Sequence, residues 1–371
     1  MNDSRPCASR AVVSHSPRRL PPQAADSRLV WLQRSFFGGI GNTLITAGLI
    51  WVLFETIPNL LRWAFFDAVW YTPNPEACRA AIGACWAVVP EKYRVMLFGT
   101  FPYEEHWRGV LVIAIILGMA VVSTIRRLWS YWLFVAWLAA MAAVFVLMLG
   151  GVFGLKPIET YEWGGLPLTL IMFVGTVVGG LPAGILLALG RRSTMPVIRA
   201  LCVGFIEIVR GLPLVTILFM ASLMFPLFLP EGMTIDKFMR AQIAMAIFFA
   251  AYAAEVVRGG LQAIPRGQFE AADTIGLSYW QKTTRIVLPQ VMRIVLPSMM
   301  NEIIRAFKNT TFIGIIGLFD VLRATSTAIQ DPSWVRYSIE AYLSIFVLYF
   351  VLCFAMSKYS ERVERDIAVR R

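Results

Sequence analysis

Eight long apolar stretches constrain this chain more than any other feature of its sequence. They cover residues 43–64, 108–125, 130–151, 166–190, 201–228, 239–257, 297–318 and 340–357. A helix of about 20 apolar residues is long enough to cross the hydrocarbon core of a bilayer. Because 58% of the residues are hydrophobic and only 15% are charged, a soluble core could not hide this apolar surface. We therefore expect an all-α integral membrane protein with about eight transmembrane helices, the fifth interrupted at Pro213.

The distribution of basic residues predicts how these spans are oriented. Arg and Lys gather in residues 1–35, 126–127, 191–199 and 258–296, whereas the 67–107 loop has five acidic and three basic residues. Cytoplasmic loops are the ones enriched in Lys and Arg, so both termini are expected in the cytoplasm. Residues 1–35 contain six Arg and no apolar signal-peptide core, which predicts a disordered basic tail. The net charge of +11 comes without a basic stripe of interleaved aromatics, which argues against nucleic-acid binding.

The cysteines and histidines leave little room for redox or metal chemistry. Cys78 and Cys85 lie in the 67–107 loop, where an oxidising compartment would allow a disulfide between them. The spacing alone leaves two free thiols as an equal alternative. Only two His are present, so we expect no metal site.

Ionisable residues inside the apolar stretches recur as pairs three residues apart. Each such residue costs about 2.5–3.5 kcal/mol to insert, and a spacing of three places both members of a pair on one helix face. For the first two pairs, mutual neutralisation within the helix is the expected role. The pairs are Glu207–Arg210, Glu255–Arg258 and Glu302–Arg305.

The third pair belongs to a denser polar segment, "NEIIRAFKNTT", at the start of the seventh stretch. Two helical turns of polar side chains cannot all reach the cytoplasmic surface. Because a polar helix face in a membrane bundle lines water or a polar ligand path, this segment is predicted to line a substrate path or gate. The alternative is helix packing and cytoplasmic anchoring. The residues predicted to line the path are Asn301, Glu302, Arg305, Lys308 and Thr310, together with Arg210.

The polar segment Glu270–Pro289, "EAADTIGLSYWQKTTRIVLP", interrupts the apolar pattern. Gly276, Lys282 and Thr283 fit a phosphate-binding loop, but Gln281 stands where that loop needs its second glycine. No apolar strand precedes the segment. We therefore interpret the near match as chance, and expect neither a nucleotide site nor enzymatic activity in this chain.

The same segment carries the pattern E-A-A, three residues, G, nine residues, I-x-L-P. It resembles the cytoplasmic signature of the permease subunits of bacterial ABC importers. The flanking "IEIVRGLPL" and "NEIIRAFKNTTFIGIIGLFD" are similar to polar amino-acid permeases of the histidine/arginine/glutamine type. The three extra N-terminal spans, with "ACRAAIGACWAVV" and "FPYEEHWR", look like the M-type subunit of general L-amino-acid importers or of glutamate/glutamine/aspartate/asparagine importers.

This resemblance implies an organisation for the chain. A three-helix extension, 36–160, would precede a five-helix type I permease core, 161–365, and a tail, 366–371. Within the cytoplasmic coupling segment, 258–296, Glu270 to Ile275 would form a short helix, Gly276 a sharp turn, and a second helix would run to a stop at Leu288–Pro289. The residues expected to receive the motion of a partner ATPase are Glu270, Ala271, Ala272, Gly276, Leu277, Ile286, Leu288 and Pro289.

The resemblance also implies a function and partners. The chain would be the permease subunit of an ATP-driven importer of polar L-amino acids in a bacterial inner membrane. Its partners would be a homologous permease subunit, a cytoplasmic ATPase dimer and a periplasmic binding protein. No cofactor would bind this chain, since ATP and Mg would be used by the ATPase.

One stretch departs from many relatives, which have Thr at position 212 and a Gln soon after. This chain has Leu212, Thr216 and Ile217 there, and Thr216 is included among the predicted path residues. Two alternatives remain open. The chain could be a structural permease subunit whose partner carries the substrate path, or a secondary transporter that works without ATP.

Overall fold

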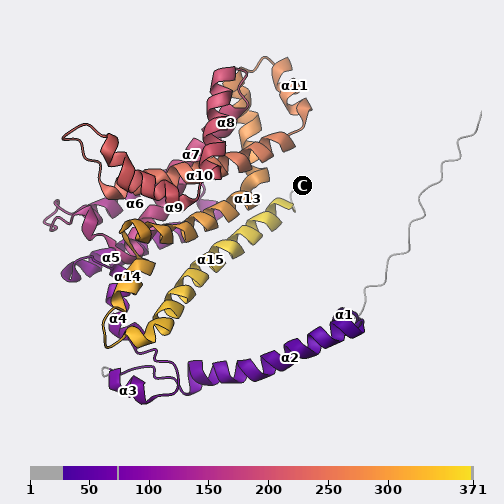
Figure 1. Cartoon of the computed structure of the whole chain (residues 1–371). Helices are drawn as coiled ribbons and strands as arrows, with labels where there is room; N and C mark the ends of the chain where they lie inside the picture. The colour runs from indigo at the N-terminus through magenta and orange to yellow at the C-terminus, as the bar shows by residue number, and fades with distance from the viewer. Residues whose placement is uncertain (1–27, 73–74, 369–371) are drawn as a thin grey trace, which may run out of the picture. The chain divides into compact units, whose positions relative to one another are not determined.

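The computed structural model describes residues 28–72 and 75–368 (Figure 1). The chain forms two compact units, Met1–Asp67 and Ala68–Arg371. In the first unit, α1 (Arg28–Phe37) is followed by α2 (Ile40–Leu61) and a π-helical turn, η1 (Arg62–Phe66). The Thr46 hydroxyl donates a hydrogen bond to the Phe36 carbonyl at 2.9 Å, which fastens the end of α1 to α2.

The prediction of a disordered tail over residues 1–35 does not hold for its last part. Residues 28–35 are helical, as the first part of α1. Apolar residues such as Val30, Trp31 and Leu32 end the polar composition of the tail at this point and favour a helix. Residues 1–27 lie outside the described part of the chain.

The second unit begins with a small helical cap. α3 (Pro75–Ala80) and α4 (Val88–Phe98) precede a 3₁₀ turn, η2 (Tyr103–Glu105). Cys78 and Cys85 are joined in a buried disulfide, and the Cys85 N–H donates to Glu340 Oε1 at 3.0 Å. Lys92 Nζ donates to Asp331 Oδ2 at 2.7 Å, and this hydrogen bond lowers the pKa of the Asp331 carboxyl below its ordinary value.

α5 (His106–Ser123) and α6 (Tyr131–Leu149) form a helical hairpin joined by the turn η3 (Arg126–Leu128). The fully buried Arg108 closes the open end of this hairpin. Its Nε donates to the Leu147 carbonyl at 2.6 Å and its Nη1 to the Lys156 carbonyl at 2.9 Å. A further 3₁₀ turn, η4 (Thr160–Glu162), leads into the helices that hold the candidate site.

α7 (Gly165–Arg191) and α10 (Lys237–Ala263) form the central helix pair of this unit. Glycines allow their backbones to approach closely. A Cβ atom added to Gly180 would lie 2.7 Å from the Ala246 carbonyl oxygen, and one added to Gly184 would lie 2.9 Å from that of Ala250. This use of glycine is typical of helix pairs in membranes, where close packing replaces hydrophobic collapse.

A broken span lies between α7 and α10 in the sequence. α8 (Pro196–Gly211) is followed by α9 (Leu214–Phe219), which continues through η5 (Met220–Met224) and η6 (Phe225–Phe228). The two halves are bent by 106°. The bend falls at Leu212 and Pro213, where the sequence predicts it, because Pro213 has no N–H to donate to the preceding turn.

The C-terminal part packs around α13 (Leu288–Asn309), which is reached from α10 through α11 (Arg266–Thr274), α12 (Tyr279–Gln281) and the π-helical turn η7 (Lys282–Val287). After α13 come the 3₁₀ turn η8 (Thr310–Ile316), the two-residue strand β1 (Phe319–Asp320) and α14 (Val321–Ala328), which packs against α4. The turn η9 (Val335–Tyr337) then leads into α15 (Ser338–Ala368), which packs along α13 (Figure 1).

The described helices confirm an all-α membrane protein but not all eight expected spans. Six are long and apolar enough to cross a bilayer, or seven if the bent α8–α9 pair is one span. The expected span 297–318 is α-helical only to Asn309, and Glu302, Arg305 and Lys308 make it too polar for this group. The expected tail at 366–371 is helical as far as Ala368, the end of α15.

Candidate functional site

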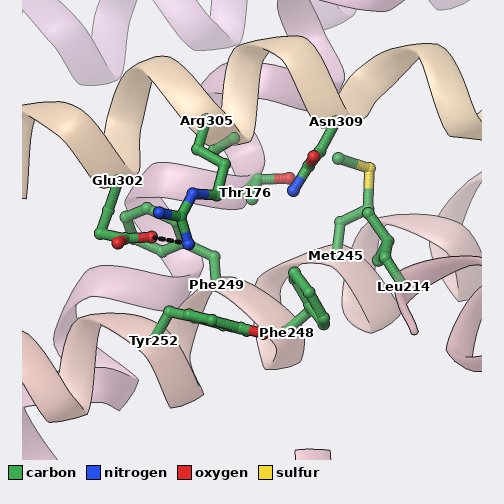
Figure 2. A pocket seen from close by; sticks show the side chains of 10 residues that line it. Thr176, Leu214, Met245, Phe248, Phe249, Tyr252, Glu302, Arg305 and Asn309 are labelled. Carbon is green, nitrogen blue, oxygen red and sulfur yellow. Dashed lines mark ion pairs between the residues drawn. The ribbon is translucent and has the colours of Figure 1, made fainter. Parts of the chain in front are cut away.

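A pocket lies where α7, α9, α10 and α13 converge (Figure 2). Its volume is about 10 Å³, which is the space of one water molecule. The break at Pro213 matters here, because it allows α9 to begin at the pocket wall. The lining residues are Thr176, Leu214, Met245, Phe248, Phe249, Tyr252, Glu302, Arg305, Ala306 and Asn309.

An ion pair beside aromatic rings forms the charged end of the pocket. Arg305 Nη1 lies 3.4 Å from Glu302 Oε2, and the Arg305 guanidinium is 5.6 Å from the centre of the Tyr252 ring. Tyr252 and Phe248 pack with ring centroids 4.8 Å apart. Figure 2 shows Arg305 and Glu302 reaching down from α13 toward the Tyr252 ring on α10. The pocket thus combines one positive group, one negative group and an aromatic wall.

The other end of the pocket is neutral and polar. Asn309 points from α13 toward Thr176 on α7 (Figure 2). The buried Thr176 hydroxyl accepts a hydrogen bond from Gln242 Nε2 at 3.2 Å, which fixes its position. An amide and a hydroxyl at this end can each donate to or accept from a polar ligand group.

The structure brings together only some of the residues that the sequence predicts for the path. Glu302 and Arg305 line the pocket, and the Arg210 guanidinium lies 5.7 Å from the centre of the Tyr252 ring. Asn301, Lys308 and Thr216 are exposed and do not line the pocket. Thr310 is buried, and its hydroxyl donates to the Phe307 carbonyl at 2.7 Å.

Sequence reasoning missed the aromatic wall and the neutral end. Phe248 and Tyr252 are four residues apart on α10, so they share a helix face, and Glu255 lies one turn further along. Two rings and a carboxylate on one face of an otherwise apolar span are a pattern from which the sequence could have predicted this wall. Thr176 and Met245 carry no such signal, because only the packing of α7 against α10 brings them to the pocket.

Two of the three predicted intrahelical ion pairs form. Arg258 Nε donates to Glu255 Oε1 at 2.7 Å, and Glu302 pairs with Arg305. The prediction for Glu207 and Arg210 is wrong, because each pairs with a different helix. Arg191 of α7 reaches Glu207 at 3.1 Å, and Arg210 lies 3.7 Å from Glu255 of α10. Charged side chains of neighbouring helices therefore replace the partner three residues away in the same helix.

The segment from α11 to α13 is the second candidate site. α11 ends at Thr274, and Gly276 has a φ of 72°, in the left-handed region that glycine adopts without strain. Ser278 then caps α12 by accepting a hydrogen bond from the Gln281 N–H. The Lys282 Nζ lies 2.6 Å from Asp273 Oδ1, which holds the two sides of the turn together.

The predicted helix–turn–helix is present here, with one correction. The chain does not stop at Leu288–Pro289 but continues from η7 into α13, where Pro289 occupies the first turn. Proline is tolerated there because the π-helical turn η7 directly before it already departs from the regular hydrogen-bond pattern. Of the residues predicted for coupling, Ala272 is buried, Leu277, Ile286 and Leu288 are half-buried, and Glu270, Ala271, Gly276 and Pro289 are exposed.

Comparison with known proteins identifies the family. A model described as "Binding-protein-dependent transport system inner membrane component" matches residues 180–369. Over nearly its whole length the chain is similar to the inner membrane amino-acid ABC transporter permease protein YhdY of Escherichia coli (strain K12). The two are 42% identical over 367 residues, which cover 96% of this chain and 97% of the relative. The chain belongs to this permease family. This confirms the family that the E-A-A segment indicates.

The permease is therefore a multi-pass inner-membrane component of a transport system rather than a catalyst. It is also similar to the glutamate/glutamine/aspartate/asparagine transport system permease protein BztC of Rhodobacter capsulatus, with 34% identity over 423 residues, covering 95% of the permease and 96% of the relative. Among solved structures, an amino acid ABC transporter with histidines matches 54% of the permease and 90% of that chain, at 30% identity and a TM-score of 0.48.

Proposed function

We propose that this chain is the transmembrane permease subunit of an ATP-driven importer of polar L-amino acids, with the pocket on its translocation path. The observation that carries this proposal is the Glu302–Arg305 pair in the pocket of a chain whose full-length relatives are named as amino-acid permeases. An amino acid carries one positive and one negative group on its backbone, so a pocket with one group of each sign matches it.

Each pocket group has a role in this proposal. The Arg305 guanidinium donates two parallel hydrogen bonds to the substrate carboxylate, and Glu302 accepts from the ammonium group. Asn309 and Thr176 supply neutral hydrogen-bonding groups for a polar side chain. The Tyr252 and Phe248 rings cover the apolar part of the substrate and exclude water.

In this proposal the pocket is in a closed conformation. A space of about 10 Å³ holds a water molecule but not an amino acid. In this conformation Glu302 and Arg305 pair with each other, so neither of these two pocket charges lacks a partner. Substrate entry requires the facing surfaces of α10 and α13 to separate, with the substrate replacing the internal ion pair by two new ones.

A partner supplies the motion. Ile275, Tyr279 and Trp280 are exposed around the Gly276 turn, and an apolar cluster on a polar segment is typical of a protein-binding surface. We assign it to a cytoplasmic ATPase dimer that uses ATP and Mg, with both permease termini on the same side. A homologous permease subunit and a periplasmic binding protein complete the importer, and no cofactor binds this chain.

Uptake by the reconstituted complex tests the proposal. The complex is purified through this chain, its soluble partners are identified, and vesicles are supplied with ATP and labelled acidic, amide, neutral and basic amino acids. Arg305→Ala removes charged hydrogen bonds worth about 1.5–3 kcal/mol each, so uptake at low substrate should fall about tenfold or more. Arg362→Ala is the control, because Arg362 is exposed on the neighbouring helix α15, outside both the pocket and the coupling segment 258–296.

Two results would favour the alternatives. Unchanged uptake in Arg305→Ala and Glu302→Gln, at matched amounts of complex, would mean that the partner permease carries the path. Uptake by this chain without an ATPase would indicate a secondary transporter. The predicted path residues outside the pocket, Asn301, Lys308, Thr216 and Thr310, are tested as alanine variants in the same assay.

A further inference from the structure

A cluster of ion pairs joins α7, α8 and α10 next to the pocket. Glu255 is its centre, because it contacts three arginines from three helices. Its Oε2 lies 3.2 Å from Arg191 Nη1 of α7 and 3.7 Å from Arg210 Nη1 of α8, and its Oε1 accepts from Arg258 of α10 at 2.7 Å. The Glu255 side chain is 23% exposed, whereas Glu207, the other acid of the cluster, is 54% exposed and contacts only Arg191.

One contact of Glu255 leads to the pocket. Arg210, held by Glu255, has its guanidinium 5.7 Å from the centre of the Tyr252 ring, which forms the pocket wall. The Arg305 guanidinium lies at a similar distance, 5.6 Å, from the same ring. Tyr252 precedes Glu255 by three residues on α10, so ring and carboxylate share a face of that helix. Moving Arg210 therefore changes the surroundings of the pocket wall directly.

Another contact leads to the exposed coupling segment. Arg192, adjacent to Arg191 at the end of α7, donates from Nη1 to the Leu261 carbonyl at 3.1 Å. Its guanidinium also lies 5.5 Å from the centre of the Phe269 ring in α11. Consecutive arginines at the end of α7 thus contact the coupling helix α11 and the Glu255 cluster.

We propose that Glu255 is a positioning residue that couples movement of α11 to the pocket. It holds α8 against α10 in the closed state through Arg210, and α7 against α10 through Arg191. A displacement of α11 that moves the end of α7 draws Arg191 away from Glu255, and α8 moves with it because Arg191 also pairs with Glu207 of α8. The 3.7 Å contact between Arg210 and Glu255 is then lost, Arg210 leaves the pocket wall, and the pocket opens. The inference rests on the proposed function in taking an amino acid as the transported molecule and a partner ATPase as the source of the movement of α11.

The proposal depends on the ion pairs between helices being either formed or broken, with no stable intermediate distance. A hydrogen-bonded ion pair weakens steeply with distance, and an arginine that leaves a half-buried carboxylate needs another partner. Packed helices that share such pairs have discrete arrangements rather than a continuous range. Arg191 has that second partner in Glu207, 3.1 Å away, and can remain neutralised when it leaves Glu255.

Glu255→Gln tests the proposal in the purified complex, because it keeps the shape of the side chain and removes its charge. Charged hydrogen bonds of this kind account for about a tenfold change in an equilibrium. We expect the amount of amino acid moved per ATP hydrolysed to fall about tenfold, with faster hydrolysis in the absence of substrate. Glu361→Gln is the control, because it removes one charge from an exposed ion pair within α15, outside the Glu255 cluster, and its ratio should stay close to wild type. Glu255→Asp, which keeps the charge, should recover part of the ratio.

A distance measurement gives a readout that needs no transport. Spin labels on Ile198→Cys of α8 and Gln262→Cys of α10, both exposed, report the separation of these helices once Cys7, Cys202 and Cys353 are replaced by Ser. In Glu255→Gln a longer distance should be populated without ATP, and in the control Glu361→Gln it should not.

Two results would overturn the proposal. The first is a Glu255→Gln complex that is less stable but keeps the wild-type transport ratio and distance, which would mean a structural role only. The second is an equal change in both Gln variants. Wild-type vesicles that take up none of the amino acids would refute the proposed function instead, and the label distances would still decide the role of Glu255.

Discussion

Replacing Gly276 tests whether the turn after α11 matters for transport, and the structure predicts the order in which substitutions fail. The φ of Gly276 is 72°, and a Cβ atom added there would meet no other atom of the chain within 4 Å. The cost of a substitution is therefore conformational rather than steric. A left-handed conformation costs an ordinary L-residue about 1–2 kcal/mol, whereas Asn tolerates it. A β-branched residue such as Val adapts least well.

These costs predict that uptake decreases in the order Gly, Asn, Ala, Val at position 276. A penalty of about 1–2 kcal/mol lowers the population of the native turn relative to alternatives by about 5- to 30-fold. ATP-dependent uptake in vesicles measures the series, and co-purification of the ATPase shows whether the partner still binds. Gly267→Ala is the control, because Gly267 lies within α11, has open space around it and has no positive φ. It should transport normally.

The conformational argument would be refuted if uptake followed the size of the side chain at position 276. If Ala at position 276 transports better than Asn, the position is limited by the space that a bound partner leaves, and the conformational argument fails. If Val transports as well as Gly, the turn is not needed for coupling, and the proposed role of the α11–α12 segment fails with it.

Three further predictions concern the stability of the second unit. Cys78→Ser opens a disulfide with a sequence separation of 7, which should cost about 2.5 kcal/mol and make the 68–105 segment more sensitive to proteolysis, whereas an unchanged digestion pattern would contradict a stabilising role. Gly184→Ala places a Cβ 2.9 Å from the Ala250 carbonyl oxygen and should lower thermal stability in detergent by about 1–3 kcal/mol, whereas Gly259→Ala, which meets nothing within 4 Å, should not. Asp331→Asn should remove one acid-sensitive contribution. Lys92 lowers the pKa of Asp331 in the folded state below the ordinary Asp value of 3.8. The stabilisation by this pair is therefore complete at a pH above 3.8, and it is lost as the pH falls through the lower pKa of the folded state. The difference in melting temperature between wild type and variant should therefore shrink from about pH 7 to about pH 3, and a constant difference would exclude this pair as its source.

The parts of the fold that the sequence predicts well are those in which local chemistry decides. Long apolar stretches become membrane helices because a helix satisfies its backbone hydrogen bonds within the segment, with no water needed in the bilayer. Pro213 breaks its span and Gly276 turns the chain because each has a backbone property that no neighbour can override. The E-A-A spacing indicates the family because seven positions at fixed intervals rarely match by chance.

The parts that the sequence predicts poorly are those that depend on which helices meet. The sequence predicts Glu302 and Arg305 as pocket residues because two charges on one face of an apolar helix are costly in a membrane and typically mark a functional site. Thr176 is missed because its place in the pocket follows from the packing of α7 against α10. The Glu207–Arg210 pairing is wrong for the same reason, since Arg191 and Glu255 of other helices lie closer in space than the neighbours in sequence.

The distinction between pairs within a helix and pairs between helices also separates two roles for charge in this permease. Glu302–Arg305 lies within α13, so it can persist when helices move, and each member keeps a partner until a substrate replaces the pair. The same holds for Glu255–Arg258 within α10. By contrast, the contacts of Glu255 with Arg191 and Arg210 join separate helices and must change when those helices separate. Pairs of the first kind make charge inside the helix bundle tolerable in each arrangement of the helices, and only pairs of the second kind can favour one arrangement over another. A substrate competes for the pair within α13, whereas motion from the coupling segment acts on the pairs of Glu255, so binding and coupling use different charges of the same cluster of helices.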